Sequence, residues 1–192
     1  SDSEGGIYDA EGLDLNAVTD NKTTHGTVVG TPGTKTITND DILQLDCDIL
    51  IPAALGDRIR RDNASHVKAK LIVEAANRPI TPAADDILAQ TGIVVLPDIL
   101  ANAGGVTVNS ENQDWSLERV NAELRRKMFK AVDTVVECWH SLNDSRDEPA
   151  DGNTGDGHPA APPVLSRDLR TAALVLAIRR VANVTLQRGI WP

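Results

Sequence analysis

Three short runs of apolar residues divide the middle of the chain. Residues 48–51, 70–73 and 93–96 are rich in isoleucine, leucine and valine, and turn-forming residues bound each run. The runs lack the alternation of polar and apolar positions that marks a half-exposed strand. Strands of a parallel sheet that is covered on both faces have this pattern. The sequence therefore predicts three buried parallel strands.

The segments between these runs have the length of helices. Residues 55–63 form a short candidate helix, and residues 82–90 begin with a proline and are followed by Gly92, as in many helices. Strands that alternate with helical connections favour parallel pairing with right-handed crossovers. Residues 48–96 therefore predict a β-α-β-α-β unit, which is one half of a doubly wound sheet.

Two long helices are expected toward the C-terminus. In residues 117–139 apolar side chains recur every three or four positions, whereas residues 168–188 are apolar over more than one face. The second helix is therefore expected to be buried on several sides. Residues 1–46 are polar and rich in turns, and Thr38 has the sequence context of a helix cap.

An acidic segment at residues 141–165 is rich in Asp, Gly and Pro and has no periodicity, which predicts a solvated loop. Its glycines follow no strand, and no Gly-x-Gly-x-x-Gly motif occurs anywhere in the chain. We therefore divide the chain into a domain at 1–140, this loop at 141–165, and a C-terminal helix of the same domain at 166–192.

Composition narrows the class of protein. The chain is 41% hydrophobic and 24% charged, with no apolar stretch of membrane-spanning length and no secretory signal, which indicates a cytoplasmic protein without a membrane partner. Its net charge of −9 argues against a nucleic-acid partner. The charge comes mainly from aspartate and is accompanied by few lysines, a composition typical of proteins from high-salt cytoplasm, although an ordinary acidic protein is the alternative.

Other features limit the possible chemistry. The two cysteines do not form a disulfide framework, and the four histidines are too scattered to bind a metal. The chain begins with serine and its only methionine is Met128, so we expect that an upstream segment has been removed.

Small residues and amides follow the three predicted strands. Alanines occupy positions 53, 54, 75 and 76, and Asn77 and Asn102 follow the second and third strands. Ligands of open parallel sheets bind beyond the carboxyl ends of the strands. Small residues let a flat ring approach the backbone, and amides both donate and accept hydrogen bonds. The pattern suits a planar cofactor that carries a carboxamide, with tight alanine packing as the alternative.

Four strings in this chain, at residues 47–54, 68–79, 97–108 and 168–173, resemble glutamate dehydrogenases in order and spacing. The resemblance covers nearly the whole chain outside the 141–165 loop. It implies an α/β fold, with a Rossmann-like, doubly wound, mostly parallel sheet that lacks its first strand and glycine-rich turn, and with long C-terminal helices. Residues 1–140 are then a partial NAD(P)-binding domain.

The resemblance also implies an activity, the reversible oxidative deamination of L-glutamate to 2-oxoglutarate and ammonia by hydride transfer to NAD or NADP. Matching positions assign cofactor binding to six residues: Asp2, Ser3, Ala53, Ala54, Asn77 and Asn102. The alanines line the adenosine side, and the asparagines meet the nicotinamide end and the substrate. An aspartate near the adenosine ribose, here Asp2, favours NAD over NADP.

The chain also departs from the family pattern. The N-terminal substrate domain, with the catalytic lysine and aspartate, is missing, so no catalytic residue is expected in this chain. Asn109 replaces the serine that contacts the side-chain carboxylate of the substrate. The family usually forms hexamers, which implies a homo-oligomer. The alternative is a non-catalytic truncated relative, or an interaction subunit of a dehydrogenase oligomer.

Overall fold

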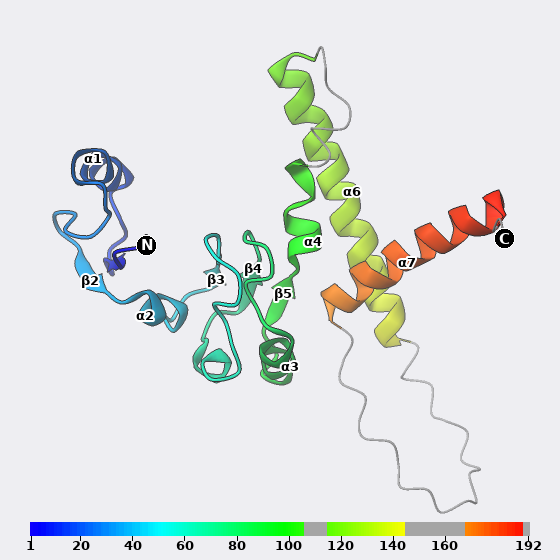
Figure 1. The fold of residues 1–192 in the computed structure, drawn as a ribbon, viewed down its shortest axis with the longest axis horizontal. Helices are drawn as coiled ribbons and strands as arrows, with labels where there is room; N and C mark the ends of the chain where they lie inside the picture. The colour runs from blue at the N-terminus through cyan, green and yellow to red at the C-terminus, as the bar shows by residue number, and fades with distance from the viewer. Residues whose placement is uncertain (106–114, 145–167, 190–192) are drawn as a thin grey trace, which may run out of the picture.

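The computed structural model describes residues 1–105, 115–144 and 168–189. Figure 1 shows three groups of elements that follow one another from the N-terminus to the C-terminus. A small N-terminal unit is followed by a central sheet, and helices α4, α6 and α7 lie beyond the sheet.

The central sheet has three strands in the order β3-β4-β5. These strands are β3 (Ile49–Leu50), β4 (Leu71–Val73) and β5 (Val94–Leu96), and both pairings are parallel. Ile72 of β4 lies opposite Leu50 on one side and Val95 on the other. The prediction of three parallel strands from the apolar runs is confirmed, with strands one or two residues shorter than the runs.

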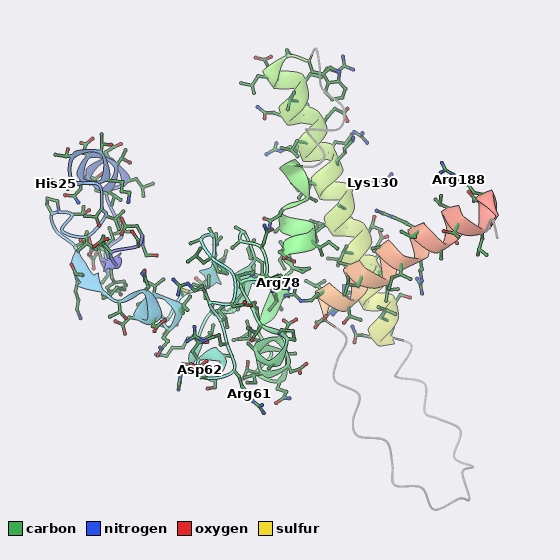
Figure 2. The ribbon with its side chains drawn as sticks, viewed as in Figure 1. His25, Arg61, Asp62, Arg78, Lys130 and Arg188 are labelled. Carbon is green, nitrogen blue, oxygen red and sulfur yellow. The ribbon has the colours of Figure 1, made fainter. Side chains whose placement is uncertain are left out.

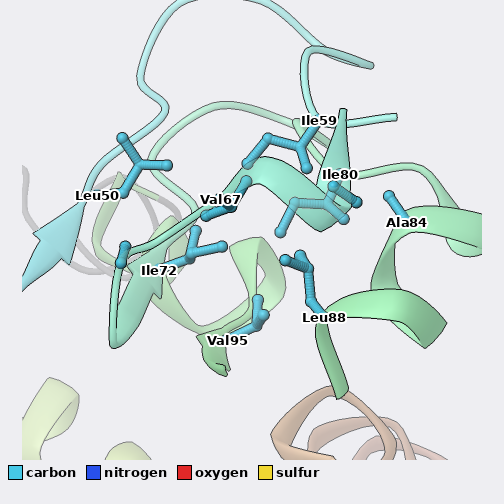
Figure 3. Packing of buried hydrophobic residues seen from close by; sticks show 10 residues of the cluster. Leu50, Ile59, Val67, Ile72, Ile80, Ala84, Leu88 and Val95 are labelled. Carbon is cyan, nitrogen blue, oxygen red and sulfur yellow. The ribbon is translucent and has the colours of Figure 1, made fainter. Parts of the chain in front are cut away.

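The main hydrophobic core packs around the middle strand (Figure 3). Ile59, Ile72 and Leu88 are completely buried. Complete burial of an aliphatic side chain of this size contributes about 1.5–3 kcal/mol to folding. The buried members of this core cluster are Leu50, Ile59, Ala64, Val67, Ala69, Ile72, Ile80, Ala84, Leu88 and Val95.

The connection between β3 and β4 is not the helix that the sequence predicts at 55–63; that prediction is wrong. The only helical turn there is the 3₁₀ helix η1 (Ala64–His66). The backbone N–H groups of Asp57, Arg58 and Ile59 donate to the carbonyls of Arg78 and Pro79, so the neighbouring loop replaces their helical partners. The second connection contains α3 (Pro82–Gln90), as predicted.

The N-terminal unit contains more regular structure than its polar sequence indicates. Strands β1 (Gly6–Tyr8) and β2 (Lys35–Ile37) pair antiparallel, and α1 (Leu15–His25) lies between them in the chain. Helix α2 (Asn39–Leu43) begins after Thr38, whose side chain accepts the N–H of Asp41 in a capping box. The predicted cap is confirmed, whereas the β1–β2 pair and α1 were not predicted.

Three helices follow β5: α4 (Asp98–Ala101), α6 (Leu117–Asp144) and α7 (Leu169–Arg188). The N-terminal part of α7 packs against α6 and β5 (Figure 1). Both predicted long helices are present. The last turn of α6 includes residues 141–144, which were assigned to the acidic loop, and the rest of that loop lies outside the described residues.

The expected burial of α7 on several sides is wrong for the described chain. Only Ala172 and Ala173 are buried. Ile178, Val181 and Leu186 are each more than two-thirds exposed, because the helix extends past α6 into solvent (Figure 1).

Candidate functional site

The loops that follow β3, β4 and β5 meet at one edge of the sheet because the strands are parallel. They comprise residues 52–55, 74–78 and 97–102, the last of which contains the short helix α4. A backbone hydrogen bond of 2.9 Å from Ala76 N–H to Pro52 O joins the first two loops. Ligands of open parallel sheets bind at this carboxyl edge.

A cavity of about 350 Å³ lies between the loop after β3 and the N-terminal segment. Its lining includes Asp2, Ser3, Ala53 and Ala54, as well as Arg58. This volume falls within the range of roughly 300–1,000 Å³ for small-molecule sites. The fold therefore brings four of the six predicted cofactor-binding residues to one cavity, from two segments that are far apart in the sequence.

The Asp2 carboxylate is held by four donors of its own chain. Lys22 Nζ and Val28 N–H donate to Oδ2 at 2.7 and 2.8 Å. Glu4 N–H and Thr27 Oγ1 donate to Oδ1 at 3.0 and 3.2 Å. The hydrogen bonds from Lys22 and Val28 lower the pKa of Asp2 well below its usual value. Asp2 is therefore ionised near neutral pH, and it organises the loop beside the cavity.

Asn77 and Asn102, the other two predicted residues, lie next to each other at the ends of β4 and β5. Asn102 Nδ2 donates to Asn77 Oδ1 at 3.4 Å and to Ala76 O at 3.3 Å. Asn102 also caps α4, since its N–H donates to Asp98 O at 2.8 Å. Asn77 is exposed and Asn102 is half-buried. The edge of the sheet thus presents a pair of amides.

The backbone that follows Asn77 is held from two sides. Arg78 has a φ of 47°, in the left-handed region, and its N–H donates to Asp98 Oδ2 at 2.8 Å. Figure 2 shows Arg78 between the sheet and the start of α7. On the other side, a Cβ placed on Gly56 would lie only 3.0 Å from Asn77 O. Glycine at position 56 therefore allows the two loops to pack closely.

A cluster of four charged side chains adjoins these loops. Arg170, in the first turn of α7, forms ion pairs with Asp85 at 2.7 Å, Glu74 at 2.9 Å and Asp98 at 3.5 Å. Glu74 is completely buried, and Glu74 Oε2 accepts the N–H of Asp98 at 2.8 Å. Burial lowers the pKa of Arg170, but Glu74 and Asp85 more than offset this effect and raise its pKa above the usual value.

Sequence reasoning missed this cluster. The signal was Glu74, an acidic residue directly after an apolar strand, because a buried carboxylate requires a partner. Asp98 closely follows a strand, where an aspartate can serve either as an acid or base or as a turn residue. Its hydrogen bonds to the backbone and its place at the start of α4 agree with the second interpretation.

Some predictions fall outside these observations. Asn109 lies outside the described residues. Within residues 1–105, 115–144 and 168–189, no group of three or more His, Cys, Asp or Glu side chains could hold a metal ion. In the same part of the chain, no helix is both long enough and apolar enough to cross a membrane.

Sequence relatives agree with the resemblance. Glutamate dehydrogenase of Thermotoga maritima is 44% identical over 199 residues, which cover 100% of this chain and 42% of the relative. The NAD-specific glutamate dehydrogenase of Staphylococcus aureus is 39% identical over 98% of this chain and 42% of its own length. The chain thus spans less than half the length of these curated relatives.

Solved structures share the fold. The hetero-hexameric glutamate dehydrogenase of Thermus thermophilus matches with a TM-score of 0.72 and 26% identity, over 98% of this chain and 40% of that one. The L-tryptophan dehydrogenase of Nostoc punctiforme matches with a TM-score of 0.58 and 21% identity, over 90% of this chain and 42% of that one. The model of the Glutamate/Leucine/Phenylalanine/Valine dehydrogenase family matches residues 1–189. The chain therefore belongs to the Glutamate/Leucine/Phenylalanine/Valine dehydrogenase family.

Proposed function

We propose that the chain is the cofactor-binding part of an NAD-dependent glutamate dehydrogenase. One observation carries this proposal: the cavity with Asp2, Ser3, Ala53 and Ala54 and the Asn77–Asn102 pair lie along the same carboxyl edge of a parallel sheet. Dinucleotides bind across this edge in doubly wound folds. The cavity accommodates the adenosine, and the amide pair faces the nicotinamide.

Each end of the cofactor has suitable partners. Ala53 and Ala54 leave room for a flat ring against the backbone. The amides of Asn77 and Asn102 offer both donors and acceptors, which complement the carboxamide of nicotinamide. The bound cofactor supplies hydride transfer, and the residues of this chain orient its two ends. The backbone N–H groups of a glycine-rich turn, which usually hold the pyrophosphate, are not in this sequence.

The charges around the cavity favour NAD over NADP. Two acidic residues, Asp2 and Asp40, and one basic residue, Arg58, are among those that line it, and Lys22 pairs with the Asp2 carboxylate at 2.7 Å. The 2′-phosphate of NADP would place roughly two further negative charges next to these acidic residues. The 2′-hydroxyl of NAD is neutral. The S. aureus relative is named NAD-specific, which agrees with this preference.

The exposed apolar surfaces support an incomplete domain. Strand β3 is at the edge of the described sheet, and Ile49 in this strand and Ile51 directly after it are more than half exposed. Unpaired apolar edge strands are avoided in finished folds. We infer that a further parallel strand pairs with β3 and completes a Rossmann-like sheet. We also infer that other parts of a cytoplasmic oligomer cover the exposed face of α7.

The substrate domain and the catalytic lysine and aspartate would lie outside this chain. Asn109 would then contact the side-chain carboxylate of glutamate through its amide, in place of a serine hydroxyl. Under the same proposal the segments at 1–140 and 166–192 form one domain that the acidic loop interrupts.

A chimera tests the proposal. The part of the T. maritima glutamate dehydrogenase that precedes the matched region is fused to this chain, and NADH formation is followed with glutamate and NAD. We expect turnover, and we expect Ala54→Leu to raise the KM for NAD about tenfold or more by filling the cavity, with little change in the KM for glutamate. Ala83→Leu, on the exposed surface of α3, is the matched control.

Two other results would reject the proposal in different ways. If the folded chimera binds NAD but does not turn over, the chain belongs to a non-catalytic relative. If Ala54→Leu has no more effect on the KM for NAD than Ala83→Leu, the cavity does not bind the adenosine.

A further inference from the structure

Arg170 links helix α7 to the two loops that carry the amide pair. Glu74 belongs to the loop after β4, and Asp98 begins the turn after β5, whereas Arg170 lies far from both in the sequence. Its guanidinium is 2.9 Å from Glu74 Oε1 and 3.5 Å from Asp98 Oδ1. One planar cation therefore contacts both loops.

The contacts continue from these carboxylates to the asparagines. Asp98 Oδ2 accepts the N–H of Arg78, the residue after Asn77, at 2.8 Å. Asp98 O accepts the N–H of Asn102 at 2.8 Å. Asp98 N–H in turn donates to Glu74 Oε2 at 2.8 Å. Asp98 is thus hydrogen-bonded beside both asparagines. Arg170 Nη1 lies 3.5 Å from the other carboxylate oxygen, Oδ1, which also accepts the N–H of Ile99 at 2.7 Å.

The geometry of this network requires an arginine. Three carboxylates surround one cation, so the cluster carries a net charge of −2 with all four groups ionised, and all four side chains are at most a quarter exposed. Arg170 Nε donates a hydrogen bond to Asp85 at 2.7 Å, whereas Nη2 and Nη1 form ion pairs with Glu74 and Asp98 that lack hydrogen-bond geometry. A lysine ammonium cannot place charge toward three partners in one plane. Without the fork, repulsion between the carboxylates acts against the hydrogen bonds that join the two loops, so their spacing should change.

We propose that Arg170 is a positioning residue, which sets the distance and orientation of Asn77 and Asn102 for the nicotinamide end of the cofactor. The proposal rests on the proposed function of the same edge. The adenosine cavity is independent of Arg170, since neither Arg170 nor its three partners is among the residues that line the cavity. The two ends of the cofactor should therefore respond differently when Arg170 is changed.

The test uses the 192-residue chain and two probes, nicotinamide mononucleotide and adenosine monophosphate, in proton–nitrogen correlation spectra. Arg170→Lys keeps the charge but not the fork. We expect the side-chain amide resonances of Asn77 and Asn102 to shift. We also expect about tenfold weaker binding of nicotinamide mononucleotide, equivalent to about 1.4 kcal/mol, with adenosine monophosphate binding unchanged.

Two control variants separate positioning from stability. Arg188→Lys makes the same substitution at the exposed far end of α7 and should change nothing (Figure 2). Asp85→Asn removes the shortest ion pair of Arg170 but leaves its contacts with Glu74 and Asp98. It should lower the melting temperature, as Arg170→Lys does, with a much smaller loss of nicotinamide mononucleotide binding.

The proposal is overturned if Arg170→Lys weakens the binding of both probes equally. It is also overturned if Arg170→Lys and Asp85→Asn have similar melting temperatures and lose the same amount of nicotinamide mononucleotide binding. If the wild-type chain binds neither probe, the proposed function fails. The side-chain amide resonances of Asn77 and Asn102 then decide alone whether Arg170 positions these residues. A shift in Arg170→Lys that is absent in Asp85→Asn then supports positioning, and unchanged resonances refute it.

Discussion

Replacement of Glu74 by glutamine should destabilise the fold although it changes the side-chain volume very little. Glu74 is completely buried and uses both carboxylate oxygens, one facing Arg170 Nη2 and the other accepting the N–H of Asp98. Glutamine has one oxygen and one NH₂ group. Whichever way the amide is turned, its NH₂ group faces another donor. The variant therefore breaks either the contact with Arg170 or that with Asp98.

The expected loss follows from the burial of the pair. Removal of one partner of a buried ion pair costs about 3–5 kcal/mol. Arg170 is 24% exposed and keeps Asp85 at 2.7 Å, so the lower end of this range, about 3 kcal/mol, applies here. For a chain of this size, 1 kcal/mol corresponds to about 2–4 °C in melting temperature. We therefore expect Glu74→Gln to melt about 6–12 °C below the wild type.

Thermal unfolding followed by circular dichroism measures the effect. Asp48→Asn is the control, because the Asp48–Lys70 pair is even shorter, at 2.7 Å against 2.9 Å, but both of its side chains are at least 80% exposed. Exposed ion pairs contribute little to the free energy of unfolding, so this variant should have the same melting temperature as the wild type. If Glu74→Gln and Asp48→Asn melt at the same temperature, the buried pair adds nothing to stability, and our account of the Arg170 cluster is wrong.

Three further predictions follow from other parts of the chain. Gly56→Ala places a Cβ 3.0 Å from Asn77 O, so it should destabilise the fold by about 1–3 kcal/mol and shift the amide resonance of Asn77; an unshifted resonance would mean that the loops can separate freely. The folded-state pKa of Asp2 is depressed, so its contribution to stability is present above the unfolded pKa of about 3.9 and is lost as the pH falls. Asp2→Asn should therefore lower the melting temperature at pH 7, and the difference should shrink at pH 3. Finally, the net charge of −9 predicts a higher melting temperature in 3 M than in 0.1 M potassium chloride, because salt shortens the range of repulsion to about 3 Å at 1 M from about 10 Å at 0.1 M; equal melting temperatures would contradict the high-salt interpretation.

The elements that the sequence predicts correctly are those in which local pattern and tertiary packing agree. Ile72 and its neighbours form an apolar β-branched run, and Ile72 is completely buried in the middle strand. Thr38 is followed three residues later by Asp41, and the two form the capping box. In both places a short window of sequence contains the interactions that define the element.

Wrong predictions occur where contacts with a distant segment replace local ones. Residues 55–63 have the length of a helix, but the N–H groups of residues 57–59 donate to the loop at residues 78–79. The apolar residues at the exposed end of α7 indicate burial, yet Ile178, Val181 and Leu186 are each about two-thirds or more exposed in the described chain. Helix α1 was missed because it buries no residue and so has no apolar stripe to recognise.

The site divides in the same way. The small residues and amides at the strand ends were recognisable, because all parallel strands place their carboxyl ends at one edge. The partner of Glu74 was not, because thirteen arginines are available in the sequence and only the packing of α7 against β5 selects Arg170. A buried carboxylate at the end of a strand indicates that a cationic side chain must lie next to it, but it does not indicate which helix carries that side chain. Because that helix is α7, its first turn contacts the loops that carry Asn77 and Asn102, and we expect a displacement of α7 to alter the amide pair before it reaches the cavity lined by Ala53 and Ala54.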